Sequence, residues 1–345
     1  MILKQLWLHF VRAYIRLGLF FYFKKIKVVN VDKVPKKGAV LFLANHQNAL
    51  LDALLIATRS GRFSYFLTRA SVFQNALISN ILKSLLMLPV YRIRDGWQNL
   101  SKNNAIFETS AQLLGKEYAM VIFPEGSHHL NRTVRPLSKG FTRIIFETFE
   151  RYPELNIKLI PVGLNFINAE SFADSVSIHF GNPLKISSKD IINKTKSTTT
   201  LKDMVYNNLC QLTTHIEAEN YDFTLKKLKE LKADFLNPVA VNNCIANDFK
   251  NCEFNPSQRF SKIKKVFKSC LILLVFVPYL IWKFGFQPKI KEIEFTSTFR
   301  FAVAITLVPI HVLILTWILF LIVGITLALW YFIAVLVLVL LAVKL

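Results

Sequence analysis

Cysteine and acidic residues are both scarce in this chain of 345 residues. The 4 cysteines (Cys210, Cys244, Cys252 and Cys270) have no Cys-x-x-Cys or Cys/His spacing. They predict neither a metal site nor a disulfide framework, and we expect thiols. The chain has only 22 Asp and Glu but 43 Lys and Arg, which gives a formal net charge of +21. Such a basic surface suits a partner with dense phosphate, either nucleic acid or an anionic membrane.

Apolar residues, by contrast, are abundant in this sequence. It is 53% hydrophobic with 30 Phe, which excludes a disordered protein. Residues 301–343 hold no charged side chain, and at about 20 residues per crossing they suffice for two membrane spans. A transporter is disfavoured because this stretch offers only His311 and a few threonines as polar groups. We therefore expect membrane lipids, and no nucleic acid, as the partner.

The apolar N-terminus, residues 1–25, predicts an amphipathic helix. Arg12 and Arg16 interrupt it and no small-residue cleavage site follows, so it does not resemble a signal peptide. Polar residues recur at spacings of three and four, which predicts a helix lying in the membrane interface. The alternative is a helix packed into the protein core with one solvent-exposed side. The stripe consists of Lys4, Gln5, His9, Arg12 and Arg16.

Residues 26–185 alternate short β-rich runs with helical stretches. This alternation predicts an α/β fold, a mixed sheet flanked by helices. The expected strands are 39–44, 87–91, 119–123, 158–164 and 175–180.

The rest of the chain divides into a polar and an apolar part. Residues 186–265 should form a mainly helical extension without recognisable chemistry, and residues 266–345 should anchor the chain. Within the anchor, 269–282 is short for a crossing and could be re-entrant, interfacial or a span with its flanks. Residues 301–343 should fold back near Gly324 as a two-helix hairpin, the alternative being one tilted span plus a surface helix. Basic residues at both ends predict that the α/β domain faces the cytoplasm.

A histidine and a carboxylate follow the first strand of the predicted sheet. His46 comes just after strand 39–44, and Asp52 belongs to the helix that opens next. A neutral imidazole can take a proton from an alcohol, and a carboxylate on its other nitrogen fixes the tautomer. Six positions along a helix differ by about 240° in azimuth, so the two meet only if His46 lies on the loop. An exposed loop histidine beside a helix-terminal Asp is an equal alternative.

Groups suited to anions follow other strands. The stretch Phe-Pro-Glu-Gly at 123–126, containing Glu125 and Gly126, ends strand 119–123, and Lys139 opens a helix beside a glycine. Arg92 and Arg94 end the strand at 87–91, and their planar guanidinium groups suit phosphate.

Taken together, these blocks resemble the glycerolipid acyltransferases, which include the lysophosphatidic acid and glycerol-3-phosphate acyltransferases. The resemblance covers residues 28–185 and rests on four ordered blocks. Five residues rather than the family's four separate His46 from Asp52, and the arginine block lacks its leading glycine, which favours Arg92 over Arg94. A lost dyad geometry would imply a binding relative rather than an enzyme. The blocks are 45–52, 88–92, 123–126 and 160–163.

This resemblance implies a reaction and a role for each residue. A fatty acyl group would pass from acyl-CoA or acyl-carrier protein to a hydroxyl of a phosphorylated glycerol, most directly 1-acyl-sn-glycerol-3-phosphate, in phospholipid biosynthesis. The alternatives are glycerol-3-phosphate as acceptor, or a non-catalytic basic membrane-binding relative. His46 would be the general base and Asp52 would orient it, with no metal or other cofactor required. Arg92, Lys139 and the Glu125–Gly126 turn would hold the phosphate, with Glu125 shaping the turn or contacting glycerol hydroxyls or Lys139.

Overall fold

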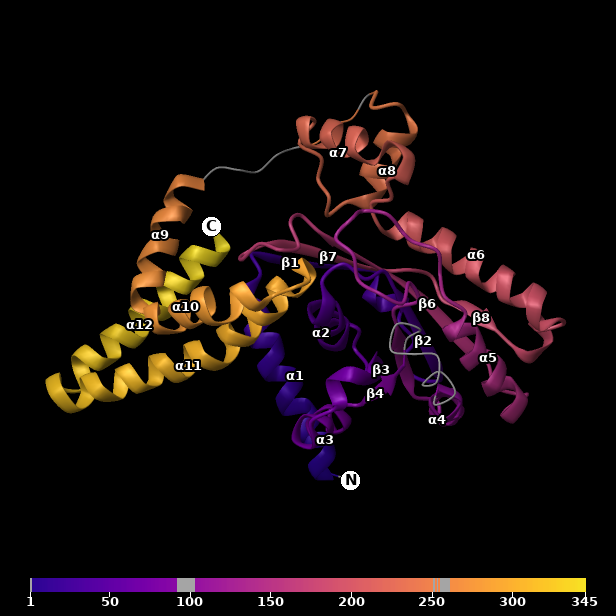
Figure 1. Cartoon of the computed structure of the whole chain (residues 1–345), viewed down its shortest axis with the longest axis horizontal. Coiled ribbons are helices and arrows are strands. Elements are labelled where there is room, and N and C mark those ends of the chain that lie inside the picture. Colours follow the sequence, from indigo (N-terminus) through magenta and orange to yellow (C-terminus); the bar gives the residue numbers. More distant parts are fainter. Residues whose placement is uncertain (1, 92–102, 251, 253, 255–260) are drawn as a thin grey trace.

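One eight-stranded sheet organises the N-terminal half of the chain (Figure 1). The structure is a computed structural model that describes residues 2–91, 103–250, 252, 254 and 261–345. The strand order is β1-β7-β6-β2-β5-β3-β4, with β8 paired to β6. The pairs β6–β7 and β6–β8 are antiparallel and the others are parallel, so the predicted mixed sheet is confirmed. The strands are β1 Lys25–Val29, β2 Ala39–Ala44, β3 Ser64–Arg69, β4 Met87–Val90, β5 Ala119–Ile122, β6 Ile157–Phe166, β7 Ser175–Phe180 and β8 Leu184–Ile186.

Helices flank this sheet and continue beyond it. The α-helices are α1 Ile2–Tyr22, α2 Ala49–Arg59, α3 Ala76–Ser84, α4 Asn103–Gly115, α5 Gly140–Arg151, α6 Lys194–Leu212, α7 Tyr221–Glu230, α8 Pro238–Ala246, α9 Ser261–Leu274, α10 Phe276–Leu280, α11 Thr296–Val323 and α12 Ile325–Lys344. Short 3-10 turns are η1 Val31–Lys33, η2 Ala70–Phe73, η5 Ser188–Asp190, η6 Ala218–Asn220, η8 Gln287–Lys289 and η9 Ile293–Phe295, and Ile281–Phe286 is a π-helical segment.

Strand β2 lies in the middle of the sheet and is buried along its whole length. Val40 and Phe42 pack into the core on one face of the sheet, which also contains side chains of α1 and α2. Leu41 and Leu43 pack into the core on the other face, with α5 and α6. A strand covered on both faces explains why this run is continuously apolar instead of alternating.

Helix α1 turns its apolar side outward. Leu6, Trp7 and Phe10 are exposed, whereas the guanidinium group of Arg12 lies 3.8 Å from the ring centroid of Phe63. Part of the polar stripe therefore faces the α/β domain and the apolar side faces the surroundings. This orientation supports the membrane-interface position of α1, which stays a prediction.

The C-terminal apolar stretch forms two helices that fold back on each other. Ile293–Val323 and Ile325–Lys344 are both long and apolar enough to cross a membrane. Their length and composition indicate that the chain is associated with a membrane. They break at Gly324, whose φ of +87° suits glycine. Helices α11 and α12 pack together and extend away from the sheet (Figure 1). The chain thus folds back at Gly324.

Both ends of this hairpin contact the α/β domain or α1. At the start of α11, the Ser297 hydroxyl donates a hydrogen bond to the Ala169 carbonyl over 2.6 Å. At the end of α12, the Lys344 ammonium donates to the carbonyls of Phe20 and Phe23, at 2.6 and 2.7 Å. The two ends therefore lie on the same side as the domain.

The short apolar stretch 269–282 is not one straight helix. It begins in α9, passes through α10 and ends in the π-helical segment. Ile263–Leu274 and Phe276–Lys289 are bent by 100° at their break, as in a broken span or a re-entrant loop.

One pair of cysteines contradicts the expectation of thiols. Cys244 and Cys252 form a disulfide, with their Cα atoms 5.3 Å apart. The chain reverses after α8 through Asp248 and Phe249, both with positive φ, and this turn brings the two cysteines together. A separation of eight positions matches no motif, so this pair could not be predicted from the sequence. Cys210 and Cys270 are free thiols, as expected.

Candidate active site

His46 and Asp52 are in direct contact where β2 leads into α2. Strand β2 ends at Ala44 and α2 begins at Ala49, so His46 lies on the loop, as predicted. Its Nδ1 is 2.8 Å from Oδ2 of Asp52. The Asp52 side chain is fully buried, and the same oxygen accepts the backbone N–H groups of Gln47 and Asn48 at 2.8 and 2.7 Å. One carboxylate oxygen thus holds both the imidazole and its loop.

The extra residue between His46 and Asp52 does not separate them. The loop enters α2 through Ala49, whose φ is +39°. Left-handed backbone costs an L-residue about 1–2 kcal/mol. The hydrogen bonds to Asp52 hold this turn, and the dyad forms despite the five-residue spacing.

Two asparagines that the sequence analysis did not single out fasten this loop to the rest of the domain. The Asn45 side-chain amide donates to the Leu164 carbonyl at 3.0 Å, and its carbonyl accepts the Leu164 N–H at 2.7 Å. The Asn48 amide donates to the Ala169 carbonyl at 2.8 Å. Their position directly after a buried strand is the only sequence signal for this role.

The Phe-Pro-Glu-Gly motif meets the dyad because β2 and β5 are neighbouring parallel strands. Their carboxyl ends open on one edge of the sheet, where α/β folds place their sites. The Phe123 ring stacks on the His46 ring with centroids 4.0 Å apart, and the His129 N–H donates to the His46 carbonyl at 3.0 Å. Gly126 turns the chain with a φ of +74°.

Glu125 is buried beneath this turn and is paired with Arg135. Arg135 Nε donates to Oε2 of Glu125 over 2.7 Å, and the His46 backbone also hydrogen bonds to the carboxylate. Arg135 Nη1 donates to the Ser127 hydroxyl at 2.8 Å. The partner of Glu125 is thus Arg135, not Lys139, and the carboxylate joins the motif to the histidine loop. Arg135 was missed because it stands in no recognisable block.

Burial changes the acidity of Glu125. Desolvation raises the pKa of its carboxyl to about 7, against the opposing attraction of Arg135. The folded chain therefore binds more protons than the unfolded chain between the ordinary value of 4.5 and about 7. Its free energy of unfolding must fall as pH rises through this window.

We expect Glu125→Gln to remove this pH dependence. The decline in unfolding free energy between about pH 4.5 and pH 7 should shrink by on the order of 1–3 kcal/mol, because glutamine does not titrate. Thermal unfolding of both proteins in detergent at several pH values measures this difference. Asp174, whose pKa burial raises to about 6, contributes equally to both proteins. An unchanged slope in the variant would rule out titration of Glu125.

The structure does not bring Lys139, one of the predicted phosphate-binding residues, into contact with the dyad. Lys139 is exposed at the start of α5 and lines a cavity of about 500 Å³ beside α4, α5 and α6, whose lining does not include His46 or Asp52. The Ser138 N–H donates to the Pro124 carbonyl at 2.7 Å, which fastens the start of α5 to the motif. Arg92 and Arg94 lie outside the described residues.

The described chain beside that arginine block is held in place. Strand β4 ends at Val90. It runs parallel to β3, and β3 runs parallel to β5, so the carboxyl end of β4 lies at the same sheet edge as the dyad. The Tyr91 N–H donates to the Asn103 side chain at 2.9 Å, and the Asn103 amide donates to the Tyr91 carbonyl at 2.7 Å.

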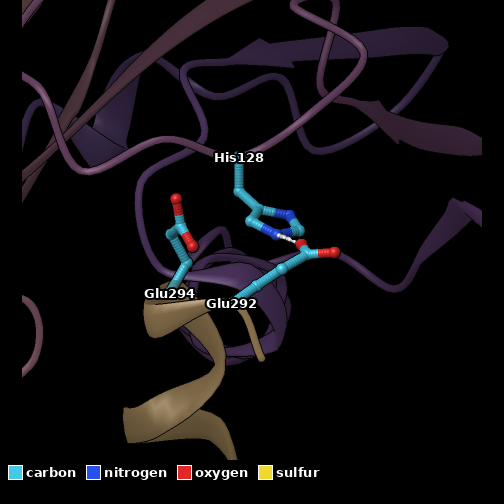
Figure 2. Close-up of side chains that lie close together, drawn as sticks. All are labelled: His128, Glu292 and Glu294. Atoms are coloured by element: carbon cyan, nitrogen blue, oxygen red, sulfur yellow. Dashed lines mark hydrogen bonds and ion pairs between the residues drawn. The ribbon is translucent and has the colours of Figure 1, made fainter. Parts of the chain in front are cut away.

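A second histidine lies beside the first. The His128 ring centroid is 5.6 Å from that of His46, and the rings meet edge to face. His128 Nε2 is 2.9 Å from Oε2 of Glu292, which comes from the segment before α11, with Glu294 next to it (Figure 2). No sequence pattern predicted a role for these three residues, because their closeness depends on how the α11–α12 hairpin docks.

Comparison with known proteins shows that this part of the chain is similar to a family. Residues 25–165 match the family model described as Acyltransferase. The chain is 30% identical over 84 residues to glycerol-3-phosphate O-acyltransferase 1 of Saccharomyces cerevisiae, covering 24% of this chain and 11% of that protein. It is 29% identical over 149 residues to a probable 1-acyl-sn-glycerol-3-phosphate acyltransferase of Mycoplasma pneumoniae, covering 41% and 53%.

A solved structure is also similar, the 1-acyl-sn-glycerophosphate acyltransferase PlsC of Thermotoga maritima. Its TM-score is 0.43 at 14% identity, with 60% of this chain and 79% of that chain covered. The chain spans about half the length of the Mycoplasma relative and a small part of the yeast one. Residues 25–165, which match that family model, carry the His46–Asp52 pair and the Phe-Pro-Glu-Gly turn.

Proposed function

We propose that this chain is a membrane-bound O-acyltransferase that transfers a fatty acyl group from an acyl thioester to a hydroxyl of 1-acyl-sn-glycerol-3-phosphate. The contact between His46 and Asp52 at the sheet edge, within the residues that match the Acyltransferase family model, carries the proposal. An Nδ1–H donated to Asp52 leaves Nε2 as the basic nitrogen, which is the tautomer that a general base needs.

The reaction then needs no side-chain nucleophile. As Nε2 of His46 takes the hydroxyl proton, the acceptor oxygen attacks the thioester carbonyl carbon. The tetrahedral intermediate collapses with cleavage of the carbon–sulfur bond, and the imidazolium returns the proton to the leaving thiolate. The products are an ester and a thiol. Asp52 stabilises the imidazolium while it exists.

Charge complementarity would hold both substrates. Arg92, Lys139 and the Gly126 turn supply donors for the acceptor phosphate. The donor is acyl-CoA or acyl-carrier protein, and the basic surface suits the phosphates of the first and the acidic surface of the second.

Removing either cation should weaken acceptor binding. We expect Arg92→Ala and Lys139→Ala each to raise the acceptor KM about 10- to 100-fold, because a charge-assisted hydrogen bond contributes roughly 1.5–3 kcal/mol. The donor KM should change little. Steady-state kinetics with each substrate varied in turn measures this, and Lys229→Ala on exposed α7 is the matched control. An unchanged acceptor KM in both variants would reject the assignment.

Glycerol-3-phosphate is the second candidate acceptor, because it offers the same phosphate and hydroxyl and the yeast relative is named for it. Mass spectrometry of the products from a panel of acceptors and both donors decides between the two. We expect diacylated glycerol phosphate to predominate. Preferential acylation of glycerol-3-phosphate would favour the second candidate, and acylation of neither would reject both.

The α/β domain is proposed to face the cytoplasm. Both hairpin ends contact the domain side, and Arg300 and Lys344 are the basic residues that bracket the apolar run. In intact cells, a cysteine added after Leu345 should stay unlabelled by a membrane-impermeant reagent, whereas Thr326→Cys near the turn should react. External labelling of the C-terminal cysteine would contradict this topology.

A further inference from the structure

Three side chains with metal-binding atoms converge where the membrane hairpin meets the active-site loop. His128 follows the Phe-Pro-Glu-Gly turn, and Glu292 and Glu294 precede α11 (Figure 2). One ligand atom from each lies within 4.8 Å of the other two. The His128 side chain is only 8% exposed, whereas that of Glu292 is 54% exposed. The cluster thus has a buried nitrogen and a carboxylate open to solvent.

Contacts outside the cluster hold these residues together. The Phe295 ring packs edge to face on the His128 ring, with centroids 4.7 Å apart. A turn further into α11, Ser297 and Arg300 donate hydrogen bonds to the backbone carbonyls of 169 and 170, at 2.6 and 2.7 Å. The segment with the two glutamates is therefore docked on the domain by neighbours that bind no metal.

The charge within the cluster is not balanced. Glu292 is hydrogen bonded to His128, but in the part of the chain that the structure describes the Glu294 carboxylate has no hydrogen bond or ion pair. Two carboxylates this close repel each other unless a proton or a cation lies between them. In a chain with a net charge of +21, such an acidic pair stands out.

We propose that His128, Glu292 and Glu294 bind a divalent transition-metal ion, with Zn²⁺ the best fit. Imidazole nitrogen and carboxylate oxygen are both zinc ligands, and the imidazole disfavours Mg²⁺ and Ca²⁺. Bonds of about 2.0–2.2 Å to one ion would bring the donor atoms to roughly 3–3.5 Å from one another. The Glu294 carboxylate therefore has to close by roughly 1–2 Å, which its long side chain on the short turn η9 allows.

The ion would take the place of a proton. Without metal, the Nε2–H of His128 donates to Glu292; with metal, Nε2 becomes a ligand and this proton is released. The ion would then clamp the start of the membrane hairpin to the loop whose next residue, His129, hydrogen bonds to the His46 carbonyl. In this proposal the ion has a structural role: it lies beside His46 but takes no part in the proton transfer proposed there.

Metal titration of the full chain in detergent tests the proposal. After removal of metals with a chelator, calorimetry with ZnCl₂ and elemental analysis after gel filtration should give one tightly bound Zn²⁺ per chain. Glu292→Gln and Glu294→Gln should each weaken affinity at least about 10-fold, and His128→Ala should remove tight binding. The exposed neighbour variant His129→Ala should bind as the wild type does. Mn²⁺ should bind more weakly, and Mg²⁺ more weakly again.

Thermal unfolding gives a second readout that does not depend on activity. Zn²⁺ should raise the melting temperature of the wild type and of His129→Ala, but not that of the Glu→Gln variants, because only binding to the folded state stabilises it. The Glu→Gln variants conserve shape and keep the test valid if His128→Ala does not fold. Absence of saturable Zn²⁺ binding, or equal affinity in wild type and both Glu→Gln variants, would overturn the proposal, whether or not the chain transfers acyl groups.

Discussion

The variant His46→Ala should lose acyl transfer by roughly 10²–10⁴-fold, because a neutral alcohol is a poor nucleophile without a general base. The loss should appear in kcat, with acceptor binding nearly unchanged, since His46 is not among the groups proposed to hold the phosphate. Purified wild type and variant, assayed for thiol release and for product under the same conditions, provide the measurement.

Folding has to be measured beside activity in this variant. The His46 ring stacks on Phe123, so its removal also deletes packing within the loop. A melting temperature close to that of the wild type, together with the lost activity, assigns the effect to chemistry. Turnover at the wild-type rate in folded His46→Ala would eliminate the general-base mechanism.

Asp52→Asn should also damage catalysis, with a loss of up to about 10⁴-fold, because a neutral amide cannot stabilise the imidazolium that forms on His46. The backbone N–H groups of Gln47 and Asn48 would hold the one remaining oxygen at the Oδ2 position. The amide nitrogen would then take the buried Oδ1 position, which has no hydrogen-bond partner in the described chain, so stability should also fall by about 1–3 kcal/mol.

The two effects in Asp52→Asn can be measured separately. Product formation gives kcat, and chemical or thermal unfolding gives the change in stability. A folded Asp52→Asn protein that keeps near wild-type kcat would show that the negative charge of Asp52 does not assist His46.

The sequence predicted that the His46 loop and the Phe-Pro-Glu-Gly turn follow strands, because each comes directly after a continuous apolar run. The runs that became β2 and β5 are uninterrupted and apolar, and the chemistry-bearing residues follow each directly. Parallel neighbours open on one edge, so His46 and Phe123 meet although they are far apart in the chain. The rule that six helical positions cannot face each other also placed His46 on the loop correctly.

Features that depend on tertiary docking could not be predicted in this way. Strand β1 is short and Lys-rich, and β3 begins with Ser64 and ends with Thr68 and Arg69. Neither is a continuous apolar run, so neither was expected. The partnership of Glu125 with Arg135 depends on how a loop folds over the turn. The contact of His128 with Glu292 requires the hairpin to return to the domain, which no local pattern encodes.

The central claim is that the acyl group passes from the thioester to the acceptor hydroxyl without an acyl-enzyme intermediate. Its most direct test is a single-turnover reaction of the purified chain with an isotopically labelled acyl thioester and 1-acyl-sn-glycerol-3-phosphate. Mass spectrometry follows the lipid and the intact protein in the same samples. We expect diacylated glycerol phosphate to form only when the acceptor is present, with one thiol released per product and no change in the mass of the protein. Absence of the diacylated product, or a labelled acyl group retained on the protein without acceptor, would contradict the mechanism.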